Sequence, residues 1–262
     1  MTNLAYAVSD TRTMLRRNLR RAVRYPSMTL SVVGMPIIFL LLFVYVFGGT
    51  LGAGIGGPAG GGRYVDYVAP GIFVMTAASA SVATAVSICT DMTEGIVARF
   101  RTMAIFRPSM LAGHVVGNML QAMVATGLVI AVALLIGFRP TAGAVRWIEA
   151  IGVLAMVTLA LTWLAVALGL VSKTPETASN LPLPLLLLPF LGSGFVPTDS
   201  MPVGLRWFAE YQPFTPVMET LRSLLLGGSL GLHAVLAVAW CAAITVAGFV
   251  AAVALFNRRP AR

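Results

Sequence analysis

Charged residues are scarce in this sequence. They make up 10% of its 262 residues, whereas apolar residues make up 58%. Soluble domains carry about 25% charged and roughly 45–50% apolar residues. A chain of this length cannot bury so much hydrocarbon in water, so the composition excludes a water-soluble fold and predicts an integral membrane protein.

Signatures of catalysis and of ligand binding are also missing. The sequence has no G-x-x-x-x-G-K-[ST] motif, which excludes a phosphate-binding loop, and no G-x-S-x-G nucleophile motif. Its two cysteines lie in apolar segments and its two histidines stand alone at span boundaries, so neither a disulfide framework nor a metal site is predicted. One G-x-G-x-x-G match, at 52–57, lies in a glycine-rich linker rather than between a strand and a helix. We therefore predict a protein that is not an enzyme and binds no cofactor or metal of its own.

What the sequence has instead is a set of long apolar runs. A helix needs about 20 residues to cross the hydrocarbon core of a membrane. Predicted spans lie at 28–48, 66–90, 115–137, 147–171 and 232–256, and a sixth, short and interrupted by three prolines, lies at 181–197. The predicted fold is an all-α transmembrane domain over residues 1–262, with six transmembrane helices within 26–256. The middle of each predicted span lacks Asp, Glu and Lys, which argues against an ion-coupled secondary carrier.

The basic residues are distributed unequally between the two predicted membrane faces. The net charge is +9, and 13 of the 18 basic residues fall on the face that carries both termini. The positive-inside rule then predicts a multi-pass membrane protein with both termini in the cytoplasm. Orientation thus accounts for the basic charge, and no nucleic-acid partner is predicted. The opposite face holds the other five: Arg63, Arg139, Arg146, Arg206 and Arg222.

Residues 1–25 are predicted to form an amphipathic helix on the inner membrane surface. At 100° per residue, six arginines fill one half of this helix, and Leu15, Leu19, Ala22 and Val23 fall on the other half. A signal peptide or a twin-arginine signal begins in a similar way, but here the apolar run that follows is longer than usual and further spans come after it. The residues predicted to contact anionic headgroups are Arg12, Arg16, Arg17, Arg20, Arg21 and Arg24.

The stretch FVPTDSMPVGLRWFAEYQPFTP, at 195–216, interrupts the apolar sequence with four prolines. Pro202 is predicted to start a short helix, VGLRWFAEY, that Pro213 ends. Thr215 is predicted to cap a second helix, with Pro216 at its first position and Glu219 in its first turn. About 11 helical residues cover only about 16 Å, half a membrane. Residues 198–231 are therefore predicted to be two re-entrant half-helices that dip from the outer face.

The second predicted span carries small residues at helical spacing, among them Ser79, Ala83 and Ser87. Small residues four apart let helices pack closely, and they could equally line a path for an amphiphile. Both interpretations stay open. The predicted inner loop at 91–114, DMTEGIVARFRTMAIFRPSMLAGH, contains a short helix with an apolar ridge between arginines. This helix either docks on a partner or lies against the inner face of the protein itself.

Four of these segments together resemble the membrane-spanning subunit of ABC type-2 exporters, most closely the daunorubicin/doxorubicin-resistance type of permease from actinobacteria. They are the arginine-rich start, YVDYVAPG at 64–71, TEGIVARFRTM at 93–103, and FVPTDSMP with PFTPVMETLRSLLLGG at 195–202 and 213–228. The resemblance covers essentially the whole chain. The sequence departs from the family pattern at Ala104 and at His114.

The resemblance implies a permease of the bacterial plasma membrane that works as a dimer with a second permease copy. That copy is identical in a homodimer, and a heterodimer is the alternative. Two separate ABC ATPase subunits, which bind ATP and Mg, complete the assembly. The loop at 91–114 would be the coupling helix, and the loop at 172–180 a second contact. Implied ATPase contacts are Glu94, Gly95, Arg99, Phe100, Arg101, Lys173 and Glu176. The re-entrant region would close the exit between two copies, an outer gate comprising Pro197, Pro202, Trp207, Phe208, Pro213, Pro216 and Glu219.

The cargo implied by the resemblance is a hydrophobic or amphipathic drug or antibiotic, and a lipid or a polysaccharide is the alternative. Aromatic and sulfur side chains in uncharged spans suit an apolar cargo, although such residues are also ordinary in lipid-facing positions. The residues expected along its path are Phe73, Met75, Phe190 and Phe195.

Overall fold

The computed structural model describes residues 26–50, 64–93 and 107–258, and all regular structure within these ranges is helical. Among the described residues, four helices are long and apolar enough to cross a membrane. They are α4 (Tyr64–Thr93), α6 (Arg107–Ile136), α7 (Ala144–Val171) and α12 (Leu232–Arg258). Each contains or closely matches a predicted span, which confirms an all-helical, multi-pass fold.

The other two predicted spans have a different form. Residues 28–48 correspond to α2 (Pro26–Leu41) and the π-helical turn η1 (Leu42–Val46), whose apolar part, Val32–Val46, is shorter than the four long helices. Residues 181–197 are divided between α9 (Leu183–Leu187), the 3-10 turn η2 (Leu188–Leu191) and irregular backbone. Prolines lack the N–H that a continuous helix needs, and Pro182, Pro184 and Pro189 interrupt this segment. Helix length and composition therefore identify four of the six predicted crossings among the described residues.

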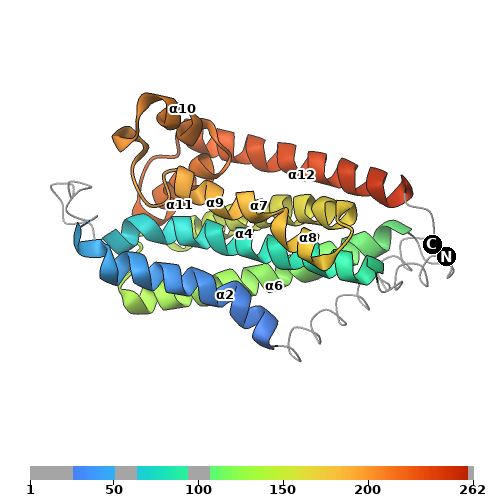
Figure 1. Cartoon of the computed structure of the whole chain (residues 1–262). Coiled ribbons are helices and arrows are strands. Elements are labelled where there is room, and N and C mark those ends of the chain that lie inside the picture. Colours follow the sequence, from blue (N-terminus) through green and yellow to red (C-terminus); the bar gives the residue numbers. More distant parts are fainter. Residues whose placement is uncertain (1–25, 51–63, 94–106, 259–262) are drawn as a thin grey trace.

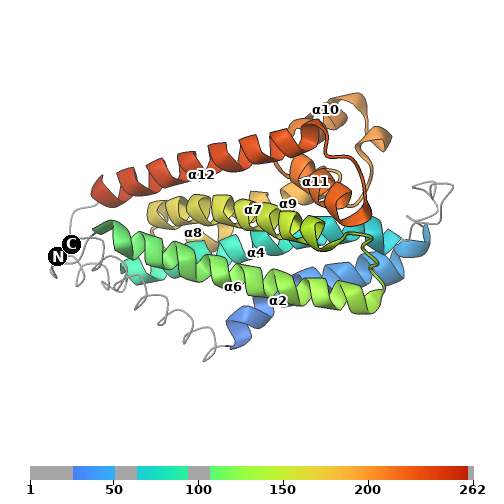
Figure 2. The same cartoon turned by 180° about the vertical axis from the view of Figure 1, so that it is seen from behind.

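The long helices lie roughly side by side, with α4 in the interior of the bundle (Figures 1 and 2). Helix α4 contacts α2, α6, α7 and α11, whereas α12 packs on α7 and α11. In the most apolar part of each helix, 67% of the α4 residues are buried but only 17% of the α12 residues. Helix α4 is therefore the core of the domain, and α12 lies at its periphery.

Glycines bring the backbones of the long helices close together. A Cβ at Gly169 of α7 would lie 2.6 Å from the carbonyl oxygen of Ala85 in α4, and a Cβ at Gly248 of α12 would lie 2.8 Å from the backbone N of Leu164 in α7. Helices in lipid associate largely by such close packing, because lipid tails are as apolar as the side chains. The α4–α7–α12 layer is held in this way.

The two ends of the bundle carry different short elements (Figure 1). The 3-10 turn η3 (Thr198–Ser200), α10 (Val203–Tyr211) and α11 (Phe214–Leu226) lie where α4 begins, and we call this the α10 end. Helix α8 (Pro175–Asn180) packs on the last part of α4, where the Cys89 thiol contacts the carbonyl of Ser172 at 3.7 Å. We call this the α8 end.

Candidate functional site

Two short helices are present where the re-entrant half-helices were predicted. Helix α10 follows Pro202 and ends before Pro213, and α11 ends at Gly227, whose φ of +85° is the left-handed conformation of a helix C-cap. Their 9 and 13 residues are about 14 and 20 Å long. Both are shorter than the roughly 30 Å of membrane hydrocarbon.

The predicted start of the second helix is wrong. Helix α11 begins at Phe214 with Pro213 as its N-cap, so Pro216 is not its first residue and no acidic residue, Glu219 included, lies in its first turn. The Thr215 hydroxyl does not cap the helix but accepts hydrogen bonds from the Ser193 amide and the Gln212 side chain, both at 3.3 Å. A tertiary contact with the segment 191–195 thus replaces the local cap.

The two helices differ in burial. Met218, Leu221, Leu224 and Leu225 of α11 are 0–1% exposed, so this helix is part of the core. Within the described part of the chain, Ala209 is the one buried residue of α10. The predicted gate residues Trp207 and Phe208 are 69% and 42% exposed. Helix α11 is therefore inserted into the bundle, whereas α10 lies on its surface.

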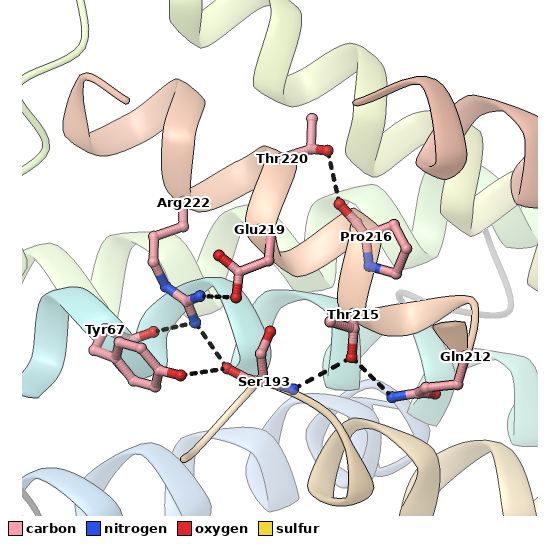
Figure 3. A network of polar contacts seen from close by, with 8 residues as sticks. All are labelled: Tyr67, Ser193, Gln212, Thr215, Pro216, Glu219, Thr220 and Arg222. Atoms are coloured by element: carbon pink, nitrogen blue, oxygen red, sulfur yellow. Dashed lines mark hydrogen bonds and ion pairs between the residues drawn. The ribbon is translucent and has the colours of Figure 1, made fainter. Parts of the chain in front are cut away.

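A half-buried guanidinium joins three parts of the chain at the α10 end (Figure 3). The Arg222 side chain is 13% exposed and forms an ion pair with Glu219 of the same helix. Its Nη2 donates to the carbonyl of Tyr67 in α4 at 3.1 Å and to the carbonyl of Ser193 at 2.9 Å. The Tyr67 hydroxyl donates to the same Ser193 carbonyl at 2.9 Å, and the guanidinium carbon lies 3.9 Å from the centre of the Tyr67 ring. We call these four residues the Arg222 cluster.

The segment 191–195 fits this place because two of its residues have no side chain. A Cβ at Gly192 would overlap the Gln212 amide and the Thr215 hydroxyl. A Cβ at Gly194 would lie 2.8 Å from the Pro189 carbonyl oxygen and 2.9 Å from the Met218 sulfur. Both glycines are therefore required for the close approach of this segment to α11.

An aromatic group packs beside the same segment. Phe190 and Phe195 stack with ring centres 4.5 Å apart and an interplanar angle of 9°, and Phe43 of η1 lies 4.4 Å from Phe195. The other predicted path residues lie elsewhere in the core: Phe73 contacts Phe138 edge to face at 5.9 Å, and Met75 is 3% exposed. The structure thus brings two of the four predicted path residues together.

The stripe of Ser79, Ala83 and Ser87 on α4 does not face the interior, whereas the pairs Ala77/Ser81 and Ala80/Thr84, at the same spacing, are buried. Ala83 is exposed and Ser79 and Ser87 are half-buried, whereas Ser81 and Thr84 on the opposite side are buried. The buried hydroxyls donate to carbonyls three or four residues earlier in the same helix, so they require no partner from another helix. The residues of the stripe are available to something outside the described chain, either lipid, cargo or another protein.

The α8 end carries two of the predicted ATPase contacts, Lys173 and Glu176, and both are exposed. Thr174 is the N-cap of α8, and its hydroxyl accepts from the Thr177 amide at 3.3 Å. The pKa of Glu176 is lowered because its charged form accepts hydrogen bonds from its own backbone amide and from Thr174. The predicted contacts at 94–101 and the arginines of the predicted interfacial helix lie outside the described residues.

Sequence reasoning missed the Arg222 cluster. Arg222 entered only as one of the basic residues of the outer face, although its spacing of three from Glu219 is a local signal for an ion pair on one helix face. Tyr67 and Ser193 gave no local signal, because they lie 155 and 29 residues from Arg222 along the chain.

Known proteins resemble this chain over most of its length. The model of the family described as "ABC-2 type transporter" matches residues 9–226. The daunorubicin resistance ABC transporter permease protein DrrB1 of Streptomyces coeruleorubidus is 32% identical over 224 residues, which are 85% of this chain and 77% of that protein. The probable doxorubicin resistance ABC transporter permease protein DrrC of Mycobacterium tuberculosis is 23% identical over 239 residues, 91% of this chain and 85% of that protein.

Proposed function

The chain belongs to the ABC-2 type transporter family and is a permease of an ABC exporter, and from this premise we propose that it exports a hydrophobic or amphipathic drug or antibiotic. The relatives named for daunorubicin and doxorubicin resistance support this class of cargo. Permeases of this family have no ATPase activity of their own. A separate ATPase subunit therefore supplies the energy, and ATP and Mg bind there.

The proposed topology has six crossings and both termini in the cytoplasm. Besides the four long helices, α2 with η1 provides one crossing, and the segment 181–197, which contains α9 and η2, provides another that its prolines interrupt. Broken helices occur at membrane depth where they are buried in protein or line a cavity. The tight packing of Gly192 and Gly194 against α11 supports this placement, because it buries the irregular backbone within the protein.

In this topology the α10 end faces outward and carries the outer gate. The observation that carries the proposal is the pair α10–α11, two helices too short to cross, the second of them inserted into the core. Two copies of the permease would meet around a shared path, and the partly exposed stripe at Ser79, Ala83 and Ser87 is available to line it. Phe190 and Phe195, on the side of this path toward the α10 end, remain our candidates for cargo contact.

The α8 end would then face the two ATPase subunits. Lys173 and Glu176 are exposed there and free to meet a partner protein. The larger contact is proposed for the loop that follows α4, with Glu94, Gly95, Arg99, Phe100 and Arg101. When ATP brings the two ATPase subunits together, the loop would move and the paired permeases would open outward.

Co-purification followed by reconstitution tests this function. The permease, tagged and extracted gently from its native membrane, is expected to carry a stoichiometric subunit with a phosphate-binding loop. In vesicles, that complex is expected to transport daunorubicin only with hydrolysable ATP, while a lipid or polysaccharide cargo would leave daunorubicin untransported. Transport that persists without ATP and follows an ion gradient would contradict the exporter function. Arg99→Glu should uncouple hydrolysis from transport, and unchanged coupling would refute the coupling-loop assignment.

A further inference from the structure

We propose that Arg222 is a positioning residue of transport, which joins α4 to α11 so that a displacement of α4 at the α8 end moves the re-entrant helix at the α10 end. The inference rests on the proposed function, because it assigns the mechanical link between the ATPase side and the outer gate. The link consists of the Arg222 cluster defined above.

Helix α4 is suited to transmit a displacement over the whole domain. Its 30 residues form one helix, about 45 Å long. One end carries Tyr64 and Tyr67, and the other end contacts Ser172 and α8 and leads directly into the proposed coupling loop. It is also the most buried of the four long helices, so its neighbours restrain it from bending independently.

The contacts that Arg222 makes between elements differ in kind from its ion pair. Glu219 lies on α11 itself, so this pair orients the guanidinium but does not hold α11 to anything else. The contacts that cross to other elements are the carbonyls of Tyr67 and Ser193 and the ring of Tyr67. Hydrogen bonds from a charged donor are stronger than those between neutral groups. Arg222 therefore makes the polar connection from α11 to α4.

The same guanidinium has the capacity to change partners. Its Nε is buried and has no acceptor among the described residues, and the Ser193 hydroxyl next to it also has none. A side chain with an unused donor can keep part of its hydrogen bonding while its neighbours shift. Such a joint suits a gate that moves during transport better than one in which each donor is already satisfied.

Other hydrogen bonds also hold the segment that contains Ser193, but they do not replace the contacts of Arg222. The Tyr64 hydroxyl donates to the carbonyl of Phe195 at 3.1 Å, which ties α4 to the same segment two residues later. The Gln212 side chain donates to the carbonyl of Leu188 at 3.0 Å and to Thr215. These hydrogen bonds join neutral groups and hold the segment 188–195 in position. In the described part of the chain, the charged groups at this site are those of the Arg222–Glu219 pair.

The test measures how many molecules of ATP are hydrolysed for each daunorubicin molecule transported. The purified complex of the permease with its ATPase subunit is reconstituted in vesicles, with wild-type permease or with Arg222→Gln, Tyr67→Leu or the double variant. Each single variant is expected to raise this ratio at least about threefold, as mutations along a coupling route do. The double variant is expected to raise the ratio no further than the larger of the two single effects, because both substitutions disrupt the same joint.

A matched control separates coupling from general damage. Arg206 on α10 also pairs with carboxylates, those of Asp199 and Glu210, but it is exposed and contacts neither α4 nor the segment 191–195 in the described structure. Arg206→Gln is therefore expected to leave the ratio unchanged. Arg222→Lys, which keeps the charge, is expected to recover part of the loss.

The outcomes also separate the joint from the proposed function. If the wild-type complex shows no ATP-dependent transport of daunorubicin, the proposed function or its cargo is wrong. If the wild-type complex transports but Arg222→Gln and Tyr67→Leu keep its ratio, the joint is refuted alone. Where Arg222→Gln lowers the amount of folded protein, Tyr67→Leu decides, because it removes the ring and leaves every charge in place. A loss of hydrolysis and transport in equal proportion would assign the cluster a structural role and overturn the proposal.

Discussion

Replacing Gly71 with alanine tests the packing between α4 and the segment 191–195. An ideal Cβ at this position would lie 2.8 Å from the carbonyl oxygen and 2.9 Å from the Cα of Gly194. Both are backbone atoms, which cannot rotate away as a flexible side chain can. The two backbones would have to separate by about half an ångström to reach ordinary contact.

The expected change in the free energy of unfolding of Gly71→Ala is the sum of two opposing contributions. Forcing an extra methyl group into a packed site costs about 1–3 kcal/mol. Alanine is favoured over glycine in a helix interior by about 1 kcal/mol, which offsets part of this cost. Gly127 of α6 and Gly152 of α7 have nothing within 4 Å of an added Cβ, so their alanine variants gain the propensity term without the clash. The expected difference between Gly71→Ala and either control is therefore the clash alone, about 1–3 kcal/mol.

The measurement is thermal unfolding of the purified protein in detergent, followed by fluorescence of its four tryptophans. For a chain of this size, 1 kcal/mol corresponds to about 2–4 °C, so Gly71→Ala should melt about 2–12 °C below the controls. Gly169→Ala and Gly248→Ala, which meet backbone atoms of α4 and α7, should behave like Gly71→Ala. Equal melting temperatures for Gly71→Ala and the two controls would show that the segment 191–195 is not seated on α4 as described.

Three further predictions concern separate contacts. Phe195→Ala should lower the free energy of unfolding by about 3–5 kcal/mol, because the ring is buried between those of Phe43 and Phe190. Phe195→Leu should lower it by less, and equal losses in denaturant unfolding would contradict the stacking. Asp66→Ala should lower the free energy of unfolding by about 1 kcal/mol, because the Arg139 amide then loses its acceptor at 2.9 Å. Asp66→Asn keeps an acceptor oxygen and should lower it by less, and thermal unfolding of the two variants checks which is less stable. The pKa of Glu176 is lowered in the folded protein, so its charge supports the start of α8 at neutral pH and loses that effect as the pH falls through this pKa. Thr174→Ala should raise that pKa toward its ordinary value in a carboxyl carbon NMR titration, and an unchanged pKa would exclude the hydroxyl as its cause.

Local patterns predicted the elements whose cause is local. The apolar run at 66–90 lies within α4, and Pro202 and Pro213 border α10 as predicted. Gly227 ends α11 because a left-handed residue satisfies the last carbonyls of a helix. The predicted start of α11 was wrong because the hydroxyl of Thr215, which the local pattern assigned to a helix cap, accepts a hydrogen bond from Ser193 of another segment.

The candidate site was predictable only in outline. Prolines and aromatics predicted the two short helices α10 and α11, and small residues predicted a stripe on α4. The partial burial of Arg222 could not be predicted. A guanidinium leaves water only where other acceptors replace it, and here these are the carbonyls of the distant residues Tyr67 and Ser193. The exposure of Ala83 likewise depends on which neighbours α4 has, and residue spacing does not specify them.

The partners that Arg222 finds on other segments are main-chain carbonyls, apart from the Tyr67 ring. Main-chain atoms are present whatever residue evolution places there. The arginine can therefore stay in use while the amino acid at position 193 drifts among small residues, limited by the space available rather than by hydrogen-bonding chemistry. Position 193, which lies between Gly192 and Gly194, can thus vary while the two carbonyl contacts of Arg222, on which the proposed joint depends, are kept.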